Sequence, residues 1–242
     1  PALEAVARHQ VEIAAAASLC TIILTGILFA RDRRMEKACG VFVPEKASFR
    51  KYWTVFVFGI AGCIAATCLM AMIQLAFYDD QYQQSAQMMY SASIPVQIIG
   101  LGIVIPVAEE LMFRGVLYKR FRERQGFWYS ALCSAILFAF MHSNATQMMY
   151  SFLLGVFLCY IYEKFGSFKA PVSLHIILNT GSVAFTELGV FAWIGADPMR
   201  MAGAVILGAF VCSVMFVLIQ RMDGQINPGN TGADQNRTDM FR

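Results

Sequence analysis

Residues 103–117 read IVIPVAEELMFRGVL, so that two adjacent glutamates and one arginine stand inside an apolar run that extends from Ile94 to about Arg120. A run of this length is sufficient to cross a bilayer as a helix. Ionisable side chains are rare inside such segments because they are costly to bury there, and they commonly mark a functional site. The stretch therefore predicts a membrane-spanning helix that carries reactive carboxylates.

The composition of the whole chain agrees with this prediction. Of its 242 residues, 58% are hydrophobic and only 14% are charged, whereas soluble domains have about 25% charged residues. Short polar connections separate seven apolar stretches: residues 11–30, 52–78, 94–120, 127–142, 146–162, 170–187 and 201–220. We therefore predict an all-α fold, a polytopic bundle of about seven transmembrane helices, in which the fourth stretch is short for a full span.

The same stretches divide the chain into four parts. Residues 1–91 are expected to form two transmembrane helices joined by a basic loop, and residues 92–187 a helix bundle that holds the candidate site. Residues 188–222 would add a C-terminal transmembrane helix, and the polar residues 223–242 a flexible tail. Within the third span, Pro106 predicts a kink just before Glu109, because proline lacks an N–H and clashes with the preceding turn.

Basic residues gather in alternate connections. The connections after the first, third and fifth spans carry seven, four and two of them, whereas the opposite side offers only Arg8 and Arg200. By the positive-inside rule, the chain is predicted to be a multi-pass protein of the cell membrane with its N-terminus outside and its C-terminus in the cytoplasm. The clusters are confined to loops and form no stripe for nucleic acid, so membrane lipid is the expected environment.

Three pairs of residues repeat one spacing on separate hydrophobic stretches: Glu110 with Arg114, Phe138 with His142, and His175 with Asn179. Residues four apart share one face of a helix. Glu110 and Arg114 are therefore expected to form an ion pair. Glu109 is turned about 100° away from Glu110 and remains free to accept a proton.

Each pair also has a purely structural interpretation. The glutamates and Arg114 could form a buried charge cluster that locks two helices, and His142 could cap a helix end. The pair of His175 and Asn179 could hold two helices together by hydrogen bonds. Taken together, however, a carboxylate base, two imidazoles and an amide are the groups needed to activate water and to stabilise an oxyanion.

A serine or cysteine nucleophile is less favoured by the sequence. Ser134, Ser173 and Ser182 lack the context of a nucleophile elbow. The seven cysteines include no C-x-x-C pair, so neither a zinc knuckle nor a disulfide framework is predicted.

The three pairs together, in this order and on separate hydrophobic helices, resemble the CPBP family, which comprises CAAX proteases and bacteriocin-processing enzymes and is also called the Abi family. The resemblance covers residues 92–187 and implies an intramembrane endopeptidase. It implies that Glu109 and His142 activate a water and that His175 and Asn179 support the oxyanion. Glu110 and Arg114 would hold the site in shape, with Phe138 packed beside His142.

The resemblance leaves two mechanisms open. Members of the family are often described as metalloproteases, and Glu109, His142 and His175 would leave one position of a catalytic zinc or similar divalent metal for water. The other mechanism is free of metal, with the glutamate alone activating the water. The expected substrate is a membrane-associated peptide or lipidated protein: a prenylated C-terminal motif, a leader peptide or a pheromone-like peptide.

Two other functions would use the same residues. One is a membrane binding or scaffold protein, such as a bacteriocin self-immunity factor, that does not cleave its partner. The other is a proton-coupled transporter, which is disfavoured because the chain shows no internal repeat of the kind found in such folds.

Overall fold

The computed structural model describes residues 9–38 and 46–222. Throughout these two ranges the regular structure is helical, which confirms the predicted all-α fold. The predicted flexible tail, residues 223–242, lies outside the described residues.

Within the described ranges, five helical segments are long and apolar enough to cross a membrane. They are α2 (Gln10–Ala38), the segment Phe49–Ala76 with η1 (Phe49–Tyr52) and α3 (Trp53–Ala76), the segment Ile94–Arg122, α9 (Ala145–Phe165) and α12 (Pro198–Gln220). The segment Ile94–Arg122 consists of α5 (Ile94–Val96), η2 (Gln97–Val104), α6 (Ile105–Glu110), η3 (Leu111–Tyr118) and α7 (Lys119–Arg122).

The sequence predicted about seven spans, and the difference from the five found comes from two helices. Helix α8 (Phe127–Ala139) has 13 residues, which at about 1.5 Å per residue cover about 20 Å of a hydrocarbon core about 30 Å thick. Helix α10 (Lys169–Glu187) has 19 residues and is not among the five. Both helices nevertheless pack inside the bundle.

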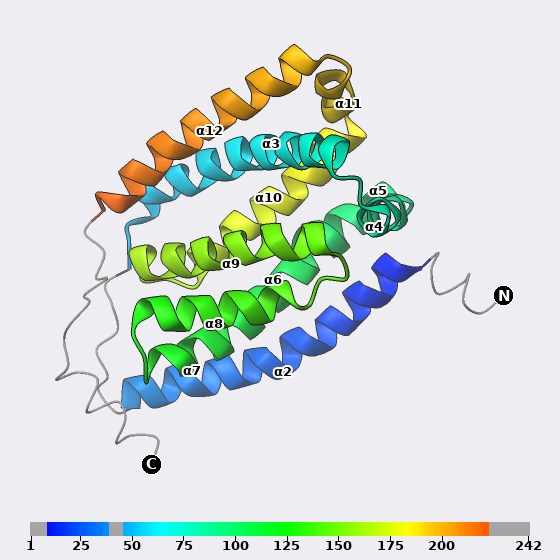
Figure 1. Ribbon diagram of the computed structural model, residues 1–242. Helices are drawn as coiled ribbons and strands as arrows, with labels where there is room; N and C mark the ends of the chain where they lie inside the picture. The colour runs from blue at the N-terminus through cyan, green and yellow to red at the C-terminus, as the bar shows by residue number, and fades with distance from the viewer. Residues whose placement is uncertain (1–8, 39–45, 223–242) are drawn as a thin grey trace.

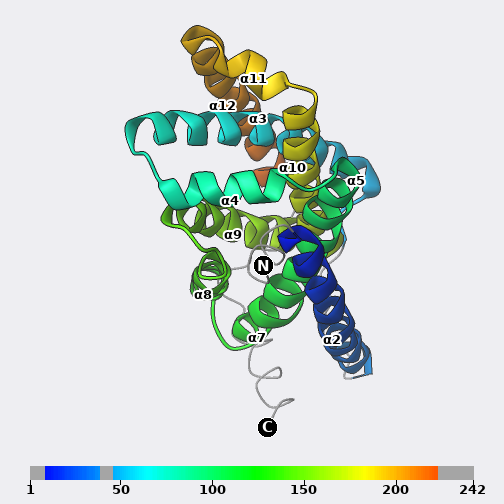
Figure 2. The ribbon, with the colours of Figure 1, turned by 90° about the vertical axis from the view of Figure 1, so that its right-hand side faces the viewer.

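Two short helices complete the described chain, α4 (Asp80–Tyr90) and α11 (Val190–Gly195). Figure 1 shows the long helices running roughly side by side, with α2 at one edge of the bundle and α12 at the other. Helix α3 packs against both α10 and α12, α8 packs against α9, and α10 packs against η2. Figure 2 shows α4 lying crosswise at one end of the bundle. The connection between α7 and α8 lies at the other end.

A small residue allows close contact between α3 and α10. A Cβ atom at Gly59 would lie 2.6 Å from the side chain of Ile177. No real Cβ atom tolerates this distance, so the two helices meet at a point where only glycine fits. This contact fixes the position of α10, which carries His175 and Asn179.

The third span is irregular where Pro106 predicts a disturbance. The segments η2 and η3, on either side of α6, are π-helical, and such segments are frequent at functional sites. Pro106 has no N–H to donate to the carbonyl of Leu101 or Gly102. Asn179 Nδ2 donates to the Leu101 carbonyl at 3.1 Å, and Thr180 Oγ1 donates to the Gly102 carbonyl at 3.2 Å. Side chains of α10 thus donate to the two carbonyls that the missing N–H could have served.

A polar network joins α4 to the ends of α3 and α9. Asp79 caps α4 by accepting hydrogen bonds from the N–H groups of Gln81 and Tyr82, and it also accepts one from Thr146 Oγ1 at 2.9 Å. Gln74 accepts from the Asp79 N–H and donates to Thr146 Oγ1. The sequence interpretation placed only a polar connection here. The cap and this network explain why residues 80–90 form a helix.

The Asp79 network makes the stability of this end of the bundle dependent on pH. The hydrogen bond from Thr146, followed by that from the Tyr82 N–H, lowers the pKa of the Asp79 carboxyl below its usual value. Because the folded-state pKa lies below that of the unfolded chain, about 3.9, this stabilisation is present above about pH 4 and is lost as the pH falls through the folded-state pKa.

We expect Asp79→Asn to lower the thermal unfolding midpoint at neutral pH, and the difference from wild type to shrink in acid. The Asp80→Asn variant, which changes the exposed neighbouring carboxylate, is the matched control. A constant difference across the pH range would contradict the role given to Asp79.

Candidate active site

The buried centre of the candidate site is an ion pair. Arg114 Nη1 lies 2.7 Å from Glu110 Oε1, and both side chains have no exposed surface. The second guanidinium nitrogen, Nη2, donates to the carbonyl of Gly155 at 3.2 Å, and the guanidinium carbon lies 4.5 Å from the centre of the Phe138 ring. These contacts satisfy part of the buried pair, whereas Glu110 Oε2 and Arg114 Nε have no hydrogen-bond partner among the residues that the structure describes.

His175 connects this ion pair to Glu109. Its Nδ1 lies 2.9 Å from Glu110 Oε1, and its Nε2 lies 3.7 Å from Glu109 Oε2. The Glu110 oxygen is an acceptor, so Nδ1 carries a proton and donates it. This hydrogen bond orients the imidazole so that Nε2 faces Glu109.

The two adjacent glutamates differ in accessibility. The side chain of Glu109 is 23% exposed, whereas those of His175 and Glu110 are 3% and 0% exposed. Glu109 is therefore the one carboxylate of this group that a water or a substrate can reach. The division of roles between the glutamates that the helical spacing suggested agrees with this difference.

The charges of the four groups balance. Glu109 and Glu110 contribute two negative charges, and Arg114 together with a protonated His175 would contribute two positive ones. A buried cluster is least costly when its charges cancel and each is hydrogen-bonded. The balance is kept if one proton lies on His175 or, alternatively, on Glu109.

His142 lies in the turn that follows α8, three residues beyond the end of that helix at Ala139. Its Nδ1 is 3.1 Å from the carbonyl oxygen of Phe138, and its Nε2 is 3.1 Å from Ser151 Oγ. The Phe138 ring centre lies 5.2 Å from that of His142 and 5.9 Å from that of His175, edge to face in both cases. Phe138 thus packs against both imidazoles and lies between Arg114 and the two histidines.

The structure does not bring all the predicted residues into direct contact. Among the residues it describes, the imidazole beside Glu109 is that of His175, and His142 is bonded to Ser151 instead. Asn179 uses one N–H of its amide for the Leu101 carbonyl. Its second N–H remains available as a donor in a fixed orientation.

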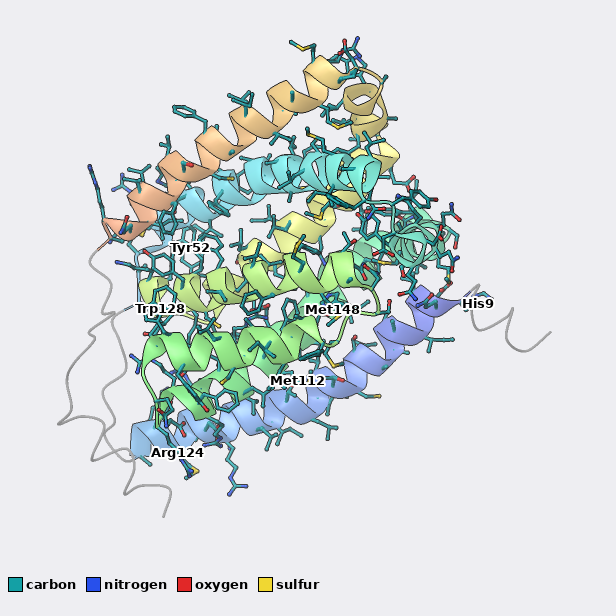
Figure 3. All side chains as sticks on the ribbon, viewed as in Figure 1. His9, Tyr52, Met112, Arg124, Trp128 and Met148 are labelled. Carbon is teal, nitrogen blue, oxygen red and sulfur yellow. The ribbon has the colours of Figure 1, made fainter. Side chains whose placement is uncertain are left out.

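The site lies deep inside the bundle. Met112, two residues beyond Glu110, is placed by Figure 3 away from both ends of the bundle, which are marked by His9 and by Arg124 with Trp128. The reactive groups therefore lie near the middle of the bundle's length.

Glu109, His142 and His175, the three predicted metal ligands, are not gathered around one position in this arrangement. Within the described parts of the chain, no group of three or more His, Cys, Asp or Glu side chains is arranged to hold an ion. His142 Nε2 is bonded to Ser151, and His175 Nδ1 is bonded to Glu110, which leaves His175 Nε2 turned toward Glu109. We therefore derive no chemical step through a metal.

Two residues of α9 that contact the site were missed by the sequence interpretation, Ser151 and Gly155. Ser151 is fully buried against His142, and Gly155 supplies the carbonyl that receives Arg114. They are four residues apart, the spacing of small residues at which two membrane helices approach closely. That pattern was the signal that could have identified them.

Gly155 offers a test of the packing around Arg114. A Cβ atom there would lie 3.0 Å from the backbone of Ala135 and 3.3 Å from Arg114 Nη2. We expect Gly155→Val to lower the free energy of unfolding by about 1–3 kcal/mol through overpacking, and to reduce activity by moving Arg114. The control is Gly203→Val on α12, where no atom would lie within 4 Å of the new Cβ. Equal effects of the two substitutions would show that Gly155 has no special packing role.

The fold and the site define a polytopic membrane protein with a carboxylate–imidazole centre, and comparisons with known proteins identify its class. Residues 91–181 match the family described as "Type II CAAX prenyl endopeptidase Rce1-like". This segment contains all the residues predicted for the site. The resemblance to the CPBP family is therefore confirmed over this segment of the chain.

Two curated proteins are similar to part of the chain. "Putative membrane peptidase YdiL" of Bacillus subtilis is 25% identical over 88 residues, which are 36% of this chain and 36% of that protein. "Uncharacterized 24.3 kDa protein" of Escherichia coli is 31% identical over 101 residues, which are 38% of this chain and 46% of that protein. The similarity thus spans less than half the length of either relative. No solved structure gave a significant match.

Proposed function

We propose that this protein is an intramembrane endopeptidase in which Glu109 activates a water to hydrolyse a peptide bond of a membrane-associated peptide. The observation that supports the proposal most strongly is the difference in exposure between the side chains of one cluster. The partly exposed Glu109 carboxylate lies 3.7 Å from His175 Nε2. The other ring nitrogen, Nδ1, is bonded to Glu110, which forms a fully buried ion pair with Arg114. The family match of the same segment to CAAX-type endopeptidases supports this reading.

The proposed reaction begins with proton transfer. Glu109 accepts a proton from a water, and the water oxygen forms a bond with the carbonyl carbon of the scissile peptide. The negative charge that leaves Glu109 appears on the carbonyl oxygen, beside the protonated His175. Because the number of charges in the cluster does not change, the buried site loses no electrostatic balance during this step.

The second step breaks the C–N bond. The oxyanion collapses to a carboxyl group, and the protonated Glu109 returns its proton to the leaving amine. His175 Nε2 and the second N–H of Asn179 are the proposed donors to the oxyanion. His142 Nε2 is the proposed second acceptor for the attacking water, so that Glu109 and His142 together orient it.

The proposed substrate is a peptide or lipidated protein held at the membrane, since a site at this depth is reached most directly by a chain that already lies in the bilayer. A prenylated C-terminal peptide is the first candidate, because the matching family is described by that activity. We also propose that the basic end of the bundle, with Arg120 and Arg122, faces the cytoplasm and that the end with α4 faces outward.

The test is direct cleavage by the purified protein in proteoliposomes. Pairs of peptides that share one sequence and differ only in a prenyl group on the cysteine near the C-terminus should be incubated with it, and the products identified by mass spectrometry. We expect the prenylated member of at least one pair to be cut at a single bond faster than its partner. If a folded preparation cuts no membrane-associated peptide, prenylated or not, the proposed activity is wrong.

A further inference from the structure

Ser151 on α9 is the side chain that bonds the basic nitrogen of His142. Its Oγ lies 3.1 Å from His142 Nε2, while His142 Nδ1 lies 3.1 Å from the carbonyl oxygen of Phe138. A carbonyl oxygen only accepts, so Nδ1 carries the proton and donates it to Phe138. In the neutral imidazole, Nε2 is then the unprotonated nitrogen and accepts the hydrogen of the Ser151 hydroxyl.

The burial of Ser151 decides between two roles for this contact. A serine bonded to Nε2 of a histidine is the arrangement of an activated nucleophile. Ser151, however, has no exposed surface, and it is surrounded by the packing of α9 against α8. A substrate carbonyl would have to reach Oγ through this packing, whereas Glu109 is open to substrate. The geometry favours an action of Ser151 through His142.

We propose that Ser151 is a positioning residue, whose hydroxyl donates to His142 Nε2 and so holds the imidazole in place, with Nε2 as the basic nitrogen of the tautomer that the Phe138 carbonyl sets. This inference deepens the proposed function and rests on it, because it assigns His142 Nε2 to the attacking water. A serine in a helix can also bond the carbonyl four residues before it. Ser151 therefore has an alternative acceptor when the water takes its place at Nε2.

Three substitutions separate the effect of the hydroxyl group from the effect of side-chain volume. Ser151→Ala removes the hydroxyl, Ser151→Cys keeps nearly the same volume with only a weak donor, and Ser151→Thr keeps the hydroxyl. We expect the first two to lower kcat about five- to tenfold with KM changed less than about twofold, and Ser151→Thr to restore most of kcat. The matched control is Ser130→Ala, since Ser130 is equally buried but donates to the carbonyl of Gly126 at the basic end of α8.

A second measurement does not depend on peptidase activity. Diethylpyrocarbonate acylates the unprotonated nitrogen of imidazole, and the chain has only three histidines, His9, His142 and His175. We expect Ser151→Ala to raise the rate of modification of His142 several-fold relative to the exposed His9, because the lone pair of Nε2 is freed. Ser151→Thr and Ser130→Ala should leave this ratio at the wild-type value.

The outcomes are distinguishable. A wild-type protein without peptidase activity would refute the proposed function and leave the modification test of Ser151 in force. An unchanged modification ratio in Ser151→Ala, or a loss of kcat that Ser151→Thr does not reverse, would overturn the positioning role. Covalent labelling of Ser151 by a fluorophosphonate would also overturn it, because it would make Ser151 a nucleophile.

Discussion

Replacement of Glu109 by glutamine is expected to lower kcat by about 100- to 10,000-fold, the contribution of a general base. The amide keeps the shape of the side chain but cannot accept the proton of the water. Because the contact of Glu109 with His175 is 3.7 Å long and its side chain is partly exposed, the unfolding midpoint should change little. The measurement is kcat for the best cleaved peptide, together with thermal unfolding of the same preparation.

The matched control for this substitution is Glu12→Gln in α2, which changes an exposed carboxylate outside the site. It should leave kcat unchanged. A Glu109→Gln variant that cleaves at the wild-type rate would show that another group removes the proton from the water, and the assignment of Glu109 would be wrong. Cleavage that persists in both Glu109→Gln and His142→Ala would argue for a function without catalysis at this site.

Replacement of Arg114 by methionine is expected to have the largest effect on stability, a loss of about 3–5 kcal/mol. The substitution leaves Glu110 fully buried without its 2.7 Å partner, and it also removes the contacts of the guanidinium group with Gly155 and Phe138. Activity should be lost as well, because Glu110 positions His175. The measurement is the free energy of unfolding in a detergent titration.

The double variant Glu110→Gln with Arg114→Met is the control for this prediction. It replaces the ion pair with two uncharged side chains, so most of the lost stability should return. Activity should stay low, since His175 Nδ1 then lacks the carboxylate that holds its proton. If Arg114→Met is as stable as wild type, the buried ion pair is not the structural centre of the site.

The helical spacing of polar residues predicted part of the site. Glu110 and Arg114 are bonded across one helical turn, as residues four apart on one face should be. Phe138 and His142 are in ring contact as predicted, although His142 lies in the turn that follows α8. The apolar stretches gave the helical class, because in a membrane every backbone polar group must be satisfied within its own segment. These features are local in sequence, and local periodicity is sufficient to predict them.

The features that the sequence interpretation missed depend on contacts between distant segments. Ser151 is hydrogen-bonded to His142, and the Gly155 carbonyl accepts a hydrogen bond from Arg114, because α9 packs against both α8 and the third span. A spacing of four residues shows which side chains share one face of a helix, but not which other helix that face packs against. The helix α4 was missed for a related reason: its cap Asp79 is reinforced by Thr146, 67 residues further along the chain.

The measurement that tests the central claim most directly is a single turnover in water labelled with oxygen-18, with enzyme in excess over peptide. The account predicts that the new carboxyl group of the product carries one labelled oxygen and that the peptide of the enzyme containing Glu109 carries none, because the water attacks the substrate itself. Label in the Glu109 carboxylate would contradict the account, since it would show that Glu109 attacks the peptide bond and that water only releases the product from it.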